Sequence, residues 1–162
     1  MYEMSARAPA EQVTFSPEDM TGVYRHADAI AAARAGWINI RPEVDPDNQP
    51  REPGLIGGVF AFLGPAVPVG TWIPGKPGRH GIELDSVGLL HPRGQQLAKR
   101  LDDLGLARPP GWRVVQDHPR RGVVFRVPPN SDVHAILAWL VSACETLAAV
   151  PLTGRWIAEV HG

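Results

Sequence analysis

The sequence predicts an α+β domain of two layers, in which a mostly antiparallel sheet carries three helices packed mainly on one face. Three separated segments repeat apolar residues with helical spacing, and the segments between them alternate apolar and polar residues with strand spacing. The 17 prolines and 17 glycines among 162 residues are typical of many turns and short strands. We expect one domain over residues 15–162, preceded by a mobile, polar tail over residues 1–14.

The first predicted helix begins near Ser16, because a serine caps a helix well and Pro17 suits the first helical position. Asp19 completes a Ser-x-x-Asp form of the capping box, and Gly36 is placed to end the helix. An apolar stripe between these ends is predicted to face the core. Its members are Met20, Val23, Tyr24, Ala27, Ile30 and Ala31.

A short strand, a loop and a buried strand are predicted next. Residues 37–41 alternate and favour a short strand, whereas residues 42–54 contain four prolines and predict a loop of more than the usual length. Residues 55–63 are an apolar run with two internal glycines. This run predicts a buried strand that bends where the glycines lie.

The middle of the chain continues this alternation of strands and helices. Residues 67–73 predict a strand, and Pro68 within them favours a position at the edge of a sheet. The alternation changes phase at Asp85–Ser86, where we expect a turn or bulge. A second helix is predicted from Pro92 to Gly105, since leucines recur there at helical spacing.

The last part of the chain predicts a hairpin, a helix and a strand. Residues 112–117 and 122–127 form the clearest hairpin pattern in the sequence. Asn130 or Ser131 is expected to cap the third helix, and residues 156–160 alternate as a terminal strand. A right-handed crossover would allow this strand to lie parallel to one strand of the hairpin.

The segment 91–126 is the most basic part of the chain. It holds eight of the sixteen lysine and arginine residues and only three acids, so its formal net charge is +5, whereas the whole chain carries −1. An anionic ligand responds to the local field of one face rather than to the total charge. The eight cations are Arg93, Lys99, Arg100, Arg108, Arg113, Arg120, Arg121 and Arg126.

Two turns in this segment share the order His-Pro-Arg, and each follows a predicted strand. Proline and glycine are residues that turns use, so the simplest interpretation is the same turn chemistry used twice. A functional interpretation adds that an exposed histidine and a planar cation hold a phosphate or carboxylate. The side chains concerned are His91 and Arg93 in the first turn, and His118, Arg120 and Arg121 in the second.

Signals for catalysis are weak, and we lean towards a protein that is not an enzyme. Asp117 and His118 are neighbours on a predicted strand, so their side chains point to opposite faces and make a poor catalytic dyad. Ser86 and Ser142 lie outside the Gly-x-Ser-x-Gly pattern of hydrolases. Cys144 lies on the apolar stripe of the third helix, and as the single cysteine it favours a cytoplasmic protein without an internal disulfide.

No cofactor, metal ion or membrane segment is predicted. The acidic loop with Glu43, Asp45 and Asp47 lacks the glycine and glutamate spacing of a calcium loop. The six histidines show no His-x-x-x-His spacing, and the glycines of residues 54–58 lack the lysine of a phosphate loop. No run of residues approaches the roughly 20 apolar residues of a membrane helix.

Four of the five tryptophans divide into two groups. Trp112 and Trp156 fit the apolar phases of their strands and are predicted to lie in the core. Trp139 lies beside the apolar stripe of its helix, and Trp72 lies on the predicted edge strand. These two either become buried in the monomer or offer an apolar surface to a partner, including a second copy in a homo-oligomer.

We expect a noncatalytic binding or regulatory module that contacts an acidic protein surface through the hairpin turn at residues 117–122. The expected contact residues are His91, Arg93, His118, Arg120, Arg121 and Arg126. Nucleic acid is a less favoured partner, because exposed aromatic residues do not interleave with the cations. The alternative is a small enzyme or sensor that binds a phosphorylated or carboxylated metabolite, if the two turns converge. A third option is a structural subunit whose basic segment pairs with acids of its own N-terminal half.

Overall fold

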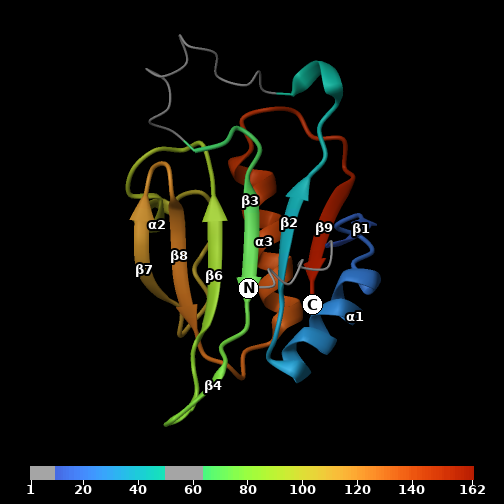
Figure 1. Cartoon of the computed structure of the whole chain (residues 1–162). Coiled ribbons are helices and arrows are strands. Elements are labelled where there is room, and N and C mark those ends of the chain that lie inside the picture. Colours follow the sequence, from blue (N-terminus) through green and yellow to red (C-terminus); the bar gives the residue numbers. More distant parts are fainter. Residues whose placement is uncertain (1–9, 50–63) are drawn as a thin grey trace, which may run out of the picture.

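The computed structural model describes residues 10–49 and 64–162, which form an antiparallel seven-stranded sheet, a two-stranded hairpin and three helices (Figure 1). The order of strands across the sheet is β1-β9-β2-β3-β6-β8-β7. In chain order these strands are β1 (Glu11–Phe15), β2 (Trp37–Pro42), β3 (Val69–Ile73), β6 (Asp85–Leu90), β7 (Arg113–His118), β8 (Gly122–Val127) and β9 (Trp156–His161). The helices are α1 (Thr21–Ala33), α2 (Leu97–Arg100) and α3 (Val133–Leu147), with a 3₁₀ turn η1 (Pro46–Asn48) and the hairpin strands β4 (Pro77–Gly78) and β5 (Gly81–Ile82).

The predicted mixture of helices with a mostly antiparallel sheet is confirmed, but the place of the last strand is not. β9 lies between β1 and β2 and is antiparallel to both. The parallel pairing with the hairpin that we considered is therefore wrong. The register sets Val13 of β1 and Ile40 of β2 beside Ala158 of β9.

The predicted mobile tail is too long, because residues 11–14 belong to β1. Phe15 at the end of this strand is buried, and its ring centroid lies 6.0 Å from that of Trp156 on β9. Burial of an aromatic side chain fixes the segment in the sheet despite its polar neighbours. Residues 1–9 of the predicted tail lie outside the described residues.

The first helix begins later than the capping signal predicts. The N–H of Asp19 donates to the carbonyl of Ser16, which closes a tight turn, and α1 starts only at Thr21. Side chains of the predicted stripe are buried as expected, with Val23 and Ala27 at 0% exposure. The helix ends at Ala33, and Arg34 follows it in a left-handed conformation with φ of 52°.

Two predictions in the region of the loop and the next strand have different outcomes. β3 is a central strand between β2 and β6, so its predicted edge position is wrong. Pro68 precedes the first residue of β3, and its missing N–H therefore does not interrupt the ladder of hydrogen bonds. Residues 43–49 of the predicted loop contain η1, whereas the strand predicted over residues 55–63 lies outside the described residues.

Asp85 does not mark the turn that the change of phase predicts. It is the first residue of β6, its side chain is buried, and its carboxylate accepts three hydrogen bonds. Arg34 Nη2 donates to Oδ1 over 2.6 Å, the backbone N–H of Gly75 donates to Oδ1 over 2.8 Å, and Trp72 Nε1 donates to Oδ2 over 3.2 Å. The chain reverses before this residue, in the small β4–β5 hairpin.

The other helices and the hairpin follow the sequence patterns with different boundaries. α2 is only four residues long, because Gly94 and Gln96 take positive φ angles of 79° and 57° just before it. The predicted hairpin is confirmed as β7 and β8, with a bulge between Val114 and Gln116. α3 is capped by Asp132, whose side chain accepts hydrogen bonds from two backbone N–H groups of the first turn.

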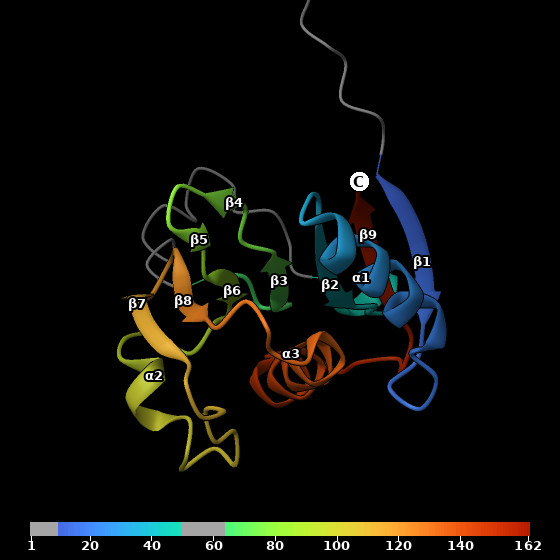
Figure 2. The ribbon, with the colours of Figure 1, turned by 90° about the horizontal axis from the view of Figure 1, so that it is seen from below.

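α3 provides the centre of the core. It contacts β2, β3, β6 and α1, while α1 also contacts β1 and α2 contacts β7. Figure 2 looks along the strands and shows α3 nearly end-on, packed against one face of the middle of the sheet. Trp72, predicted on an edge, is 1% exposed within this core. The sheet residues that are buried with it include Ile38, Ile40, Val87, Leu89, Val123, Phe125, Trp156 and Ala158.

Candidate functional site

The six residues predicted for the binding site lie in three different places. His91 and Arg93 follow β6, His118, Arg120 and Arg121 form the tip of the β7–β8 hairpin, and Arg126 lies near the other end of β8. The two His-Pro-Arg turns are at the same end of the sheet, since β6 and β7 both finish there (Figure 1). The two turns nevertheless differ, because the arginine of the first turn binds backbone carbonyls of the domain, whereas the arginines of the second turn are exposed.

The side chains of Arg93 and Arg100 donate hydrogen bonds to backbone carbonyls within the domain. Arg93 Nε donates to the carbonyl of Leu147 over 3.2 Å, and its Nη2 lies 3.4 Å from the carbonyls of Thr146 and Ala148. A guanidinium at this position satisfies carbonyls at the end of α3 and opposes the negative end of the helix dipole. Arg100 Nη2 donates to the carbonyls of residues 93 and 95. The sequence predicts Arg93 as a contact residue and places Arg100 in the basic segment, whereas in the structure both have a structural role.

His91 is fully buried, with 0% exposure. Its Nδ1 accepts the backbone N–H of Arg93 over 3.1 Å, so in the neutral ring the proton lies on Nε2. Among residues 10–49 and 64–162, that Nε2 has no hydrogen-bond partner, nor has Oδ1 of Asp117, whose Oδ2 accepts the N–H of Ala98 over 3.0 Å. Burial lowers the pKa of His91 below its ordinary value of 6.5, and Arg100 acts in the same direction, while Asp117 opposes them.

Unfolding should therefore depend on pH through His91. The unfolded chain takes up the proton near the ordinary pKa of 6.5, but the folded protein takes it up only at lower pH. Stability from this group is present above that value and is lost as pH falls towards the folded pKa. Urea unfolding on both sides of this pH should show a larger loss for wild type than for the H91Q variant. Equal losses would contradict this account.

The tip of the hairpin exposes the two remaining predicted arginines. His118 Nδ1 accepts the backbone N–H groups of Arg120 and Arg121, each over 3.1 Å, which fixes the turn. The side chains of both arginines are exposed and make no hydrogen bond or ion pair within the described part of the chain. The histidine therefore shapes the turn, as the turn interpretation predicts, and the two arginines face solvent.

Arg126 lies at the far end of the same hairpin. It is four positions along β8 from Gly122, which corresponds to roughly 13 Å along a strand. It is opposite Arg113 of β7 and Ser86 of β6, and it donates a hydrogen bond to the Ser86 hydroxyl. Since Phe125 beside it points into the core, Arg126 lies on the opposite face of the sheet. The exposed hairpin arginines therefore lie at the two ends of the hairpin, with Arg120 and Arg121 at the tip and Arg113 and Arg126 at the other end.

The basic segment has no carboxylate partners among residues 10–49 and 64–162. All five ion pairs found there use cations from outside residues 91–126. They join His26 to Glu11, Arg34 to Asp85, Arg41 to Glu159, His134 to Asp28 and Arg155 to Glu43. Pairing with the chain's own acidic half, the third sequence-based option, gains no support from these contacts.

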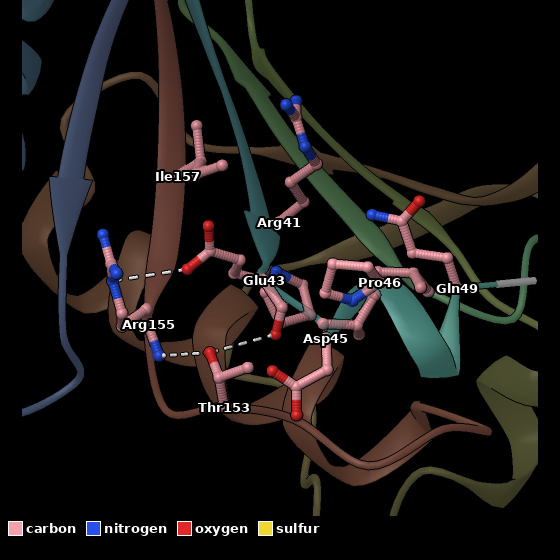
Figure 3. Close-up of a pocket in the computed structure, with 11 residues that line it drawn as sticks. Arg41, Glu43, Asp45, Pro46, Gln49, Thr153, Arg155 and Ile157 are labelled. Atoms are coloured by element: carbon pink, nitrogen blue, oxygen red, sulfur yellow. Dashed lines mark hydrogen bonds and ion pairs between the residues drawn. The ribbon is translucent and has the colours of Figure 1, made fainter.

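A cavity of about 630 Å³ lies at the same end of the sheet as the hairpin tip, between the end of β2 and the start of β9. Sequence reasoning did not predict it, because its lining comes from distant parts of the chain. Acidic and basic side chains at its wall are Arg41, Glu43, Asp45 and Arg155, and its apolar lining includes Val44, Pro46, Val67 and Ile157 (Figure 3).

Both arginines of the cavity already have acidic partners. Arg155 Nε lies 3.3 Å from Glu43 Oε2, and Arg41 forms an ion pair with Glu159. The carbonyl of Glu43 accepts the N–H of Thr153 over 3.2 Å, which ties the two walls together. Asp45 is exposed, and its carboxylate has no partner among the described residues (Figure 3). The free charge that this cavity offers to a ligand is therefore negative.

The structure adds little support for catalysis by a thiol or a bound metal ion. Burial raises the pKa of the Cys144 thiol far above its ordinary value, so this side chain is a poor nucleophile. Within the described residues, histidine, cysteine and acidic side chains do not gather in groups of three that would hold a metal ion. None of the helices in that part of the chain is both long and apolar enough to cross a bilayer.

Comparisons with known proteins give no further guide, since no family model, no curated protein and no solved structure matches this chain.

Proposed function

We propose that this protein is a noncatalytic binding or regulatory module whose β7–β8 hairpin contacts an acidic surface on another protein. The observation that carries the proposal is the set of exposed guanidinium groups at the two ends of this hairpin, none of which has a carboxylate partner among the described residues. These groups belong to Arg113, Arg120, Arg121 and Arg126.

The position of the hairpin supports this role. β7 is the last strand at its side of the sheet, so a partner can approach it without displacing another strand. Val115 at the bulge is 47% exposed, which adds an apolar contact between the basic ends of the hairpin. Arginine suits such contacts because its planar fork binds a carboxylate with two parallel hydrogen bonds.

The proposal includes the finer architecture that we expected from the sequence, with two layers and the helices mainly on one face. The contacts of α3 with β2, β3 and β6 and of α1 with α3 support it. On the opposite face, β2, β3, β6 and β8 alternate half-buried or exposed residues with buried ones. Arg126 belongs to this second set, so its guanidinium is directed away from the helices.

The R120E/R121E double variant tests the proposal. Binding of a fluorescent oligoglutamate peptide by fluorescence anisotropy should weaken at least about tenfold, which corresponds to about 1.4 kcal/mol. Wild-type binding should also weaken as salt is added, because exposed charges are screened. The R25E/R108E variant changes the total charge equally at exposed positions outside the hairpin and should bind like wild type.

A second probe separates protein from nucleic acid as the partner. A single-stranded oligothymidylate of the same charge should bind more weakly than oligoglutamate, because stacking aromatic side chains do not accompany these arginines. Preference for the oligothymidylate would overturn the choice of partner. Equal affinity of wild type and R120E/R121E for oligoglutamate would overturn the site.

A further inference from the structure

Residues 74–84, which we call the arm, project from the end of the sheet opposite to the cavity (Figure 1). In this arm β4 pairs with β5, with Pro77 opposite Ile82 and Gly78 opposite Gly81. Arg79 and His80 therefore form its tip. Figure 2 shows β4 and β5 on the side of the sheet away from α3.

The arm combines exposed apolar side chains with unpaired cations. Ile82 is 51% exposed and Leu84 is 40% exposed, and Ile73 just before the arm is 42% exposed. These are three of the five large hydrophobic side chains that are exposed within residues 10–49 and 64–162. Lys76 and Arg79 are exposed and have no acidic partner in that part of the chain, and together with the exposed Glu83 they give the arm a formal net charge of +1, with His80 counted as neutral. Clustered apolar exposure of this kind is typical of a contact surface.

Hydrogen bonds fix the base of the arm to the sheet and close its hairpin. The N–H of Gly75 donates to the buried carboxylate of Asp85, and Arg34 Nε donates to the Gly75 carbonyl over 2.9 Å. The N–H of Glu83 donates to the carbonyl of Lys76 over 3.0 Å, which closes the base of the hairpin. A preorganised arm loses little conformational entropy on binding, which favours its use in a contact.

The cavity at the other end has complementary properties. Its η1 wall carries Asp45 and the neighbouring Asp47, both exposed, and its lining includes the apolar side chains of Val44, Pro46 and Val67. Arg41 and Arg155 leave this acidic character in place, since Glu159 and Glu43 already neutralise them. Its volume of about 630 Å³ is large enough to hold a few side chains.

We propose that the arm of one copy of this protein docks in the cavity of a second copy. The argument for this occupant is that a basic, apolar projection and an acidic, partly apolar cavity of suitable size occur at opposite ends of one chain. The contact pairs Arg79 with the carboxylates of η1 and places Ile82 against the apolar lining. Because the two surfaces differ, the contact is head-to-tail: an open assembly keeps a free arm and a free cavity at its ends, whereas a closed ring uses all of them.

Sedimentation velocity of the full chain over a wide concentration range tests this assembly. Wild type should associate as its concentration rises, and the R79E and D45R variants should each weaken association at least about tenfold. The R25E and D103R variants reverse exposed charges on other elements and should associate like wild type. The R120E/R121E variant should also associate like wild type, so this inference fails or stands separately from the proposed function.

Mixing the two weakened variants gives the sharpest result. R79E retains an intact cavity and D45R retains an intact arm, and the reversed charges at positions 79 and 45 are again of opposite sign, so the mixture should regain the association that each variant lacks alone. Circular dichroism must show that both variants are folded. A wild type that stays monomeric at every concentration, variants that associate like wild type, or a folded mixture that does not regain association would each overturn the proposal.

Discussion

Replacing Asp85 with alanine should lower the free energy of unfolding by about 3–5 kcal/mol. The substitution leaves the Arg34 guanidinium, only 14% exposed, without its anionic partner. It also removes the acceptor for the N–H groups of Gly75 and Trp72 Nε1. An unpaired buried charge and two unsatisfied donors are among the costliest defects a core can carry. Domains are commonly stable by about 5–15 kcal/mol, so the loss is a large part of the total.

Urea unfolding followed by circular dichroism measures this loss. The D103A variant removes an exposed carboxylate and should change stability by less than about 0.5 kcal/mol. In the R34A/D85A variant both charges are absent, so its loss should be smaller than the sum of the two single losses. A midpoint for D85A equal to that of wild type, or strictly additive losses, would contradict a coupled pair.

The F125A variant should lower the free energy of unfolding by about 3–5 kcal/mol, in this case because a cavity is left in the core. Phe125 of β8 is fully buried, and its ring centroid lies 5.4 Å from that of Trp112 and 5.7 Å from that of Trp139. Removing the ring leaves a void where the hairpin meets α3 and breaks two aromatic contacts, each worth about 0.5–1.5 kcal/mol beyond burial.

Thermal unfolding of F125A and F125L distinguishes the loss of the ring from a general sensitivity of β8. Leucine refills part of the volume, so F125L should remain clearly more stable than F125A. The V115A variant, at an exposed position of the same hairpin, should unfold close to the temperature of wild type. If F125A and V115A lost equal stability, the aromatic cluster would not be the support of the hairpin.

Local patterns predicted elements correctly where one face of an element meets the core. The stripe containing Val23, Ala27 and Ile30 is buried on α1, and the alternation in the β7–β8 hairpin gives the observed pairing. Such periodicity can be recognised from residues that are close in the sequence. The order of strands cannot be recognised in this way, because the position of β9 between β1 and β2 depends on contacts between distant segments. Two single residues also led to wrong predictions. Pro68 favours an edge strand but lies just before a central one, and Asp85 is expected at a turn but is a buried hydrogen-bond acceptor.

The sequence predicts where the cations of the candidate site lie along the chain, but not which groups their side chains contact. Counting residues located the basic segment, and Arg120 and Arg121 are indeed exposed. The use of Arg93 at the end of α3 could not be read from the sequence, since its partners are the carbonyls of residues 146–148. The cavity was hidden for the same reason, as residues 41–49 meet residues 153–157 only after folding.

The position of β9 affects the order in which the chain can fold during synthesis. β1 and β2 emerge from the ribosome early, but the strand that joins them, Trp156–His161, comes much later. Until then β1 has no neighbour in the sheet, and one side of β2 is open. Contacts between such distant residues are slow to form. A nascent chain halted before Trp156 should therefore leave β1 unpaired and one edge of β2 open, which makes it a ready substrate for chaperones.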